Sequence, residues 1–183
     1  MPFPGDSASL SSQPVEAPEP EPPSRLRLSI VREDGDWRSF GTPQPAIETA
    51  AAALARQPRS GLARDGEASV VLGSDALVQR LNRSYRSKDA PTNVLSFPYQ
   101  RPPGAADDGY LGDVVLAVET VLREATERGI EPAQHLQHLV VHGLLHLLGH
   151  DHGTDAEAEA MERLETEILA TLGIADPYAA CAS

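Results

Sequence analysis

The stretch "HLQHLVVHGLLHLLGHDH", residues 135–152, decides how this chain folds. It is too apolar for a surface loop, and its first four histidines follow one another at spacings of three, four and four residues, along one face of a helix. Upstream, Gly129 and Pro132 indicate that the helix begins near residue 132. Gly149 can adopt the left-handed conformation that ends it near residue 148. A helix of the core has little need of so many imidazoles, so these histidines point to a function.

Three of the histidines have the spacing of a metal site. His142 and His146 project from one helical face about one turn apart, so two ring nitrogens can share one zinc ion at about 2.0–2.1 Å. A continuous helix would carry His152 about 15 Å along its axis, out of reach, whereas a turn at Gly149 brings it back. The spacing predicts one Zn²⁺ ion held by three imidazoles, with a fourth position open as in catalytic sites. A lone helical histidine is more often a hydrogen-bonded core residue, but the combined spacing favours metal.

The polar residues around these three have less specific signals. His138 could orient a ligand or simply pack beside Leu139, and we expect His135 to lie at the surface. His150 lies in the turn and is expected to point away from the ion. Asp151 could accept an imidazole N–H or satisfy backbone donors of the turn.

Gly143 separates this motif from that of the zinc peptidases. Peptidases of the His-Glu-x-x-His type place a glutamate, their general base, directly after the first histidine. A peptidase with glycine at this position would need its base from elsewhere, so peptide hydrolysis is a minor alternative.

The rest of the chain alternates short strand and helix patterns. Period-two or apolar runs predict strands, and capped runs of helix formers predict helices. These elements predict an α+β (mixed α/β) fold with one sheet and helices packed on it, in a single domain over residues 25–175. The first 24 residues, with seven of the sixteen prolines, predict a disordered acidic tail, and residues 176–183 a short C-terminal tail. The predicted strands are 25–31, 67–73, 93–98 and 110–118, and the predicted helices are 45–57, 75–85, 119–129, 132–148 and 154–172.

Net charge and cysteine content set broad limits. The formal net charge is −12, but residues 1–24 and 154–183 carry most of it, which leaves −2 on residues 25–153. Such a body can still carry a basic patch, so the acidic composition excludes no partner. The single cysteine, Cys181, allows no internal disulfide. Without a signal peptide or an apolar run of about 20 residues, we expect a soluble cytoplasmic protein that does not enter membranes.

A basic segment follows the second predicted helix. Arg80, Arg83, Arg86 and Lys88 place four positive charges within nine residues. Arginine offers a planar fork for phosphate oxygens and lysine a point charge, so the segment could bind phosphates. The simpler alternative is a solvated helix face.

Three segments of the chain together resemble a known family. They are "NRSYRSKDAPTNVLSFP" (82–98), "LGDVVLA" (111–117) and "HGLLHLLGHDH" (142–152). In this order they resemble the YbeY family of bacterial rRNA maturation factors, which are metal-dependent single-strand endoribonucleases. The resemblance covers about residues 25–172. It implies a small mixed four-stranded sheet flanked by helices, with the metal site at the end of a helix.

The resemblance also implies roles for particular residues. The family's metal ligands fall on His142, His146 and His152, and its functionally important arginine falls on Arg86. The segment that shapes one wall of the family's cleft is matched by Asp89, Pro91, Thr92, Asn93 and Ser96. Lys88 and Asn93 are expected to bind substrate. Asp113 matches the short strand motif and could be catalytic or structural; we favour structure. His150 departs from the family's usual tyrosine, which puts any role of this side chain in doubt.

The function expected from this resemblance is 16S rRNA 3′-end processing and ribosome quality control. The ion would polarise a phosphodiester oxygen or activate water, and Arg86 would stabilise the developing charge. Single-stranded RNA and the small ribosomal subunit or its proteins are the expected partners, with Tyr99 and Tyr110 as candidates for base stacking. Two alternatives remain: a ribosome-assembly factor with a structural metal, and a metallohydrolase of peptides or small phosphoesters.

Overall fold

A four-stranded mixed sheet organises residues 25–179, the part of the chain that the computed structural model describes. The strands lie in the order β1 (Leu26–Arg32), β2 (Gly66–Gly73), β4 (Tyr110–Ala117) and β3 (Val94–Pro98). The first three run parallel, and β3 pairs antiparallel with β4 at the edge. The predicted fold class is confirmed, while the predicted tail over residues 1–24 and Cys181 lie outside the described residues.

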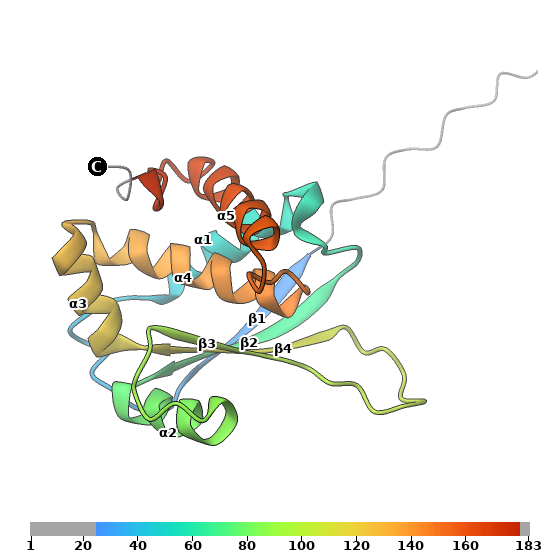
Figure 1. The fold of residues 1–183 in the computed structure, drawn as a ribbon, viewed down its shortest axis with the longest axis horizontal. Helices are drawn as coiled ribbons and strands as arrows, with labels where there is room; N and C mark the ends of the chain where they lie inside the picture. Colours follow the sequence, from blue (N-terminus) through green and yellow to red (C-terminus); the bar gives the residue numbers. More distant parts are fainter. Residues whose placement is uncertain (1–24, 180–183) are drawn as a thin grey trace, which may run out of the picture.

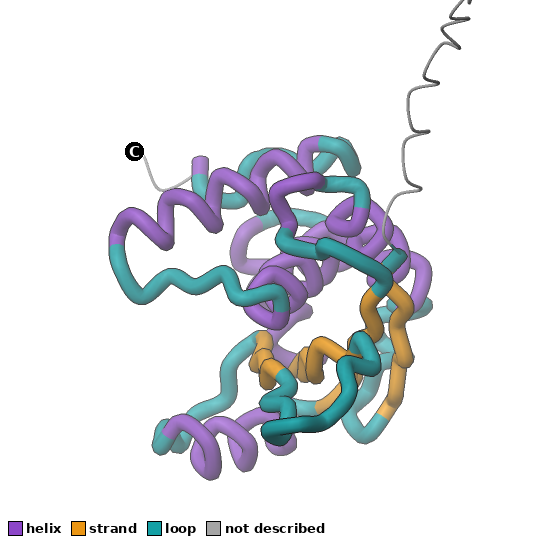
Figure 2. The backbone as a smooth tube through the Cα atoms, turned by 90° about the vertical axis from the view of Figure 1, so that its right-hand side faces the viewer, coloured by secondary structure: helices purple, strands orange, loops and turns teal. Residues whose placement is uncertain are grey.

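The helices cover the two faces of this sheet unequally (Figure 1). On one face lie α1 and α4, with α5 packed on their outer side, whereas α2 alone lies against the opposite face; Figure 2 shows the same division from the side. Every predicted helix and strand is present with ends within two residues of the prediction, and only the short 3₁₀ helix Pro58–Ser60 was not predicted. No helix between residues 25 and 179 is long and apolar enough to cross a membrane. The helices are α1 (Gln44–Ala55), α2 (Asp75–Arg86), α3 (Val118–Arg128), α4 (Pro132–Leu147) and α5 (Asp155–Ala170).

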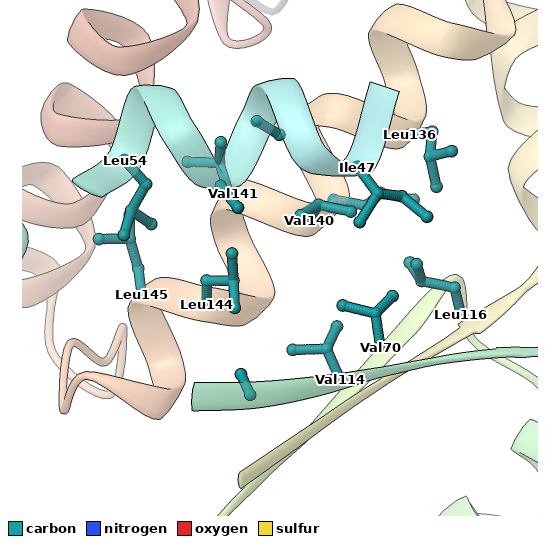
Figure 3. Packing of buried hydrophobic residues seen from close by; sticks show 14 of the residues in the cluster. Ile47, Leu54, Val70, Val114, Leu116, Leu136, Val140, Val141, Leu144 and Leu145 are labelled. Atoms are coloured by element: carbon teal, nitrogen blue, oxygen red, sulfur yellow. The ribbon is translucent and has the colours of Figure 1, made fainter. Parts of the chain in front are cut away.

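The main core lies between the sheet and the pair α1 and α4 (Figure 3). Strand residues such as Val70 and Val114 meet Val140 and Leu144 of α4, and all four are fully buried. Alternate residues of the same strands face α2, where a smaller cluster forms. Burial of a fully buried aliphatic side chain contributes about 1.5–3 kcal/mol to folding stability. Because α4 has more buried residues than the other helices, a shift of α4 would cost the most stability.

Gly143 brings α4 unusually close to the sheet. A methyl group at this position would lie 2.7 Å from Cγ1 of Val114, so only glycine allows the helix to approach this strand. The Ser96 hydroxyl of β3 donates to the Gly143 carbonyl at 3.1 Å. The C-terminal half of α4 is thereby fixed against β3 and β4.

The end of α4 forms as predicted at Gly149. Gly149 has a φ of +91°, in the left-handed region that favours glycine. Its N–H donates to the carbonyl of His146 at 3.1 Å, and the N–H of His150 donates to that of Leu145 at 3.0 Å. These are the two bonds of a Schellman motif, which ends the helix and turns the chain back over its last turn.

The contact at Gly143 yields a prediction about stability. We expect Gly143→Ala to lower the free energy of unfolding, because overpacking costs about 1–3 kcal/mol while alanine's helix propensity returns only about 1 kcal/mol. Urea unfolding followed by fluorescence of Trp37, the only tryptophan and fully buried, measures the change. Gly153→Ala is the matched control, since its added methyl would lie no closer than 3.5 Å to Glu157. Equal stability of Gly143→Ala and the unchanged protein would contradict the tight contact.

Candidate metal centre

His142, His146 and His152 come together at the end of α4, as predicted. Each offers one ring nitrogen, and these nitrogens all lie within 4.8 Å of one another. The Nε2 atoms of His142 and His146 are 3.1 Å apart. The turn after Gly149 brings the ring of His152 to centroid distances of 5.7 Å from His142 and 4.9 Å from His146.

The hydrogen bonds of the first two rings fix their tautomers. Nδ1 of His142 lies 2.8 Å from Oε1 of Glu165, and Nδ1 of His146 lies 2.9 Å from the carbonyl oxygen of His150. A carboxylate and a carbonyl only accept hydrogen bonds, so both Nδ1 atoms carry a proton. In the neutral rings both Nε2 atoms therefore present lone pairs.

Two lone pairs that face each other at 3.1 Å repel unless a cation lies between them. Tetrahedral zinc bonds of about 2.0–2.1 Å separate two ligand nitrogens by roughly 3.3 Å, close to the separation in this structure. The donor set therefore fits a metal ion. Within residues 25–179 no carboxylate or thiolate joins the three imidazoles as a further ligand, so the set remains an open one.

The environment of His146 keeps its ring in the form that binds metals. Burial, together with the nearby His142 and His152, lowers the pKa of His146 to about 4. At neutral pH this imidazole is uncharged, as a metal ligand must be.

The turn that carries His152 is held by its neighbours. Nε2 of His150 lies 3.0 Å from the carbonyl of Ser60, so this ring points away from the cluster, as predicted. Asp151 accepts the backbone N–H of His152 at 2.8 Å but lies 4.0 Å from Nδ1 of His146. Of the two roles considered for Asp151, the structure shows the acceptance of a backbone N–H of the turn and not of an imidazole N–H.

Glu165 of α5 is the polar partner that the sequence analysis missed. It is 1 % exposed and accepts from His142, from Nε2 of His138 at 2.8 Å and from the Tyr178 hydroxyl at 2.5 Å. Burial raises its pKa, but the hydrogen bonds from His138, His142 and Tyr178 outweigh burial and lower the pKa to about 2. A signal was present: Glu165 lies in the apolar stripe of its helix. The other buried members of that stripe are Met161, Leu164, Ile168 and Leu169.

His135 is buried, so its predicted place at the surface is wrong. Its ring packs under α3, where Nε2 lies 2.7 Å from Oε2 of Glu124. Burial lowers the pKa of His135, although Glu124 opposes the shift. Asn93 donates its side-chain amide to the same carboxylate at 2.9 Å, so the predicted substrate-binding residue has a structural partner here.

Arg86 and Lys88 are not brought into the histidine cluster. Arg86 ends α2, on the opposite side of the sheet from α4, and Lys88 follows in the loop (Figure 1). Both are exposed, and neither side chain has a hydrogen bond or ion pair with any residue between 25 and 179.

Asp113 also lies on the α2 side, in a groove of about 770 Å³ between α2 and the sheet. The Tyr110 hydroxyl donates to Asp113 at 2.8 Å and lies 2.9 Å from the Ser69 hydroxyl. Tyr85, 71 % exposed, lines the same groove. The sheet thus lies between Asp113 and α4.

The position of Gly143 settles the comparison with zinc peptidases on structural grounds. The Cβ of a residue here would point at Val114 of the sheet, not into the space beside the ligand nitrogens. A glutamate at position 143 could not serve as the general base, and this chain has glycine there.

Comparisons with known proteins identify the family of this chain. The profile of the family described as "Endoribonuclease YbeY" matches residues 40–173. A protein of that name from Parvibaculum lavamentivorans is 50% identical over 167 residues, which cover 86% of this chain and 87% of the relative. One from Rhodospirillum rubrum is 48% identical over 164 residues, which cover 84% of this chain and 82% of the relative. The chain that carries this three-histidine centre therefore belongs to the endoribonuclease YbeY family.

Proposed function

We propose that this protein is a zinc-dependent endoribonuclease that cleaves single-stranded RNA, with precursor 16S rRNA near its 3′ end as its substrate in the cell. The observation that carries the proposal is that the Nε2 atoms of His142 and His146 lie 3.1 Å apart, beside a ring nitrogen of His152. The names of the relatives supply the reaction class. The small ribosomal subunit or its proteins are the proposed partners, and ribosome quality control in the cytoplasm is the proposed setting.

The residues around the centre prepare it for such chemistry. Glu165 and the His150 carbonyl hold protons on the far nitrogens, so that His142 and His146 offer their near ones. A metal ion held by these nitrogens would act as a Lewis acid toward a phosphodiester oxygen. Glu165 cannot act as a general base, because it is 1 % exposed and its oxygens already accept three hydrogen bonds.

Arg86 is the proposed source of charge stabilisation; because it lies on the α2 side of the sheet, the bound RNA must bring its phosphate to Arg86 around the edge formed by β3. Its guanidinium is exposed and free of acidic partners within the described chain, so it is available to a phosphate. Lys88, which is exposed, and Asn93, whose amide also donates to Glu124, are the proposed substrate-binding residues. Tyr99 and Tyr110, whose rings meet edge to face at 5.5 Å, offer the surface for base stacking.

His146 is the proposed ligand whose removal tests the metal site. We expect His146→Ala to bind less than one zinc per chain and to lose cleavage of a labelled single-stranded RNA. The loss should exceed the about 10- to 100-fold that removal of a ligand's partner costs. Elemental analysis and a cleavage assay measure the two effects. Gln134→Ala on the same helix is the matched control, and equal cleavage by both variants would indicate a contaminating nuclease.

Metal removal distinguishes a catalytic site from a structural one. Because the main core lies between α4 and the sheet, we expect a chelator to abolish cleavage but leave Trp37 fluorescence native. The midpoint temperature of thermal unfolding should fall only by the amount that corresponds to the lost binding free energy of the ion. Unfolding on chelation would instead favour an assembly factor with a structural metal.

Substitution of Arg86 and substitution of Arg83 should affect different kinetic constants of RNA cleavage. We expect Arg86→Ala to lower kcat by about 10²- to 10³-fold, as for other groups that stabilise transition-state charge. Arg83→Ala, three residues earlier on the same helix, should mainly raise KM and reduce the salt dependence of RNA binding by about one charge. An unchanged kcat in Arg86→Ala would remove this residue from the reaction.

A further inference from the structure

The segment that follows α5 returns to the metal centre. Tyr178 lies beyond residue 173, where the family match ends. Its hydroxyl donates to Oε2 of Glu165 at 2.5 Å, and its ring meets that of His138 edge to face at 5.7 Å. The contacts of the domain therefore continue past residue 175, where the sequence placed the start of a tail.

The two oxygens of Glu165 have different partners. Oε2 accepts from both His138 and Tyr178, which leaves Oε1 for Nδ1 of His142. The two donors on Oε2 fix the plane of the carboxylate, and burial excludes the water that would otherwise compete for it. Oε1 is thus aimed at one atom of one metal ligand.

We propose that Glu165 is a positioning residue that sets the tautomer and ring orientation of His142, and that Tyr178 completes this arrangement from the C-terminal segment. The inference rests on the proposed metal site. It assigns the site a support formed by α5 and the residues after it, outside the three motifs that identify the family.

His142 depends on a side chain in a way that His146 does not. His146 is oriented by a backbone carbonyl, which no substitution removes. The acceptor for His142 belongs to a residue 23 positions away, on another helix. Substitution of Glu165 therefore tests the orientation of one ligand while the backbone that holds the other stays in place.

Glutamine at position 165 keeps the shape of the side chain but replaces one acceptor with a donor. If the amide oxygen stays with the two donors on the Oε2 side, the NH₂ group faces His142. That contact favours a proton on Nε2, the nitrogen meant for the metal. In the opposite orientation the NH₂ group faces both His138 and Tyr178, and these two neighbours lose their acceptor instead.

The test is the zinc affinity of the full chain, measured by competition with a chromophoric chelator. We expect Glu165→Gln to bind zinc about 10- to 100-fold more weakly, and Tyr178→Phe about 3- to 10-fold more weakly, as for loss of one hydrogen bond. Glu159→Gln, on the exposed face of α5, and Tyr85→Phe are the matched controls. Trp37 fluorescence of the metal-free variants reports whether each is folded.

A second readout observes the tautomer directly. Long-range ¹⁵N–¹H NMR of histidine-labelled, metal-free protein should show the Nδ1–H form at His142, and a loss of that form in Glu165→Gln. A merely structural role would lower stability without this change.

The outcomes separate the inference from the proposed function. Absence of zinc binding by the unchanged protein would overturn the metal site itself. Unchanged affinity and tautomer in folded Glu165→Gln, beside a protein that binds zinc, would overturn the role of Glu165. Unchanged affinity in Tyr178→Phe would remove the C-terminal segment from the site.

Discussion

The close packing of α4 on the sheet at Gly143 determines where the proposed metal ligands lie. The glycine allows the helix to approach Val114, and the Ser96 hydroxyl holds its carbonyl. His142 precedes this contact and His146 follows it by less than one turn, so the part of α4 that lies close to the sheet carries two of the proposed ligands. The Schellman motif at Gly149 then returns His152 to the same end. One helix thus serves both as the centre of the core and as the frame of the site.

Orientation of the ligands draws on parts of the chain that are distant in sequence. His142 relies on Glu165 and, through it, on Tyr178, whereas His146 relies on the turn that follows its own helix. An ionised carboxylate beside an imidazole raises the basicity of the ring and fixes which nitrogen is free. The site therefore becomes complete only when α5 and the segment after it have packed against α4.

Sequence patterns predicted those features of the site that depend on the backbone within a few residues. The His142/His146 spacing and the Gly149 turn depend on backbone geometry within a few residues, and both are confirmed. The burial of His135 depends on Glu124 of α3, and the role of Glu165 depends on three donors, two of them on α4. These are tertiary contacts that periodicity does not contain. The acidic residue in an apolar stripe was nevertheless a usable signal.

Strand β3 connects the two sides of the molecule that the proposed function requires. It contacts α4 on one face of the sheet and α2 on the other, and it lies at the sheet's edge. A substrate that reaches both Arg86 and the histidines must cross this edge. A single strand can bend around it and expose its bases, whereas a stiff A-form duplex presents only its outer grooves and backbone. The sheet that separates the two groups of residues therefore supports the proposed preference for single-stranded RNA.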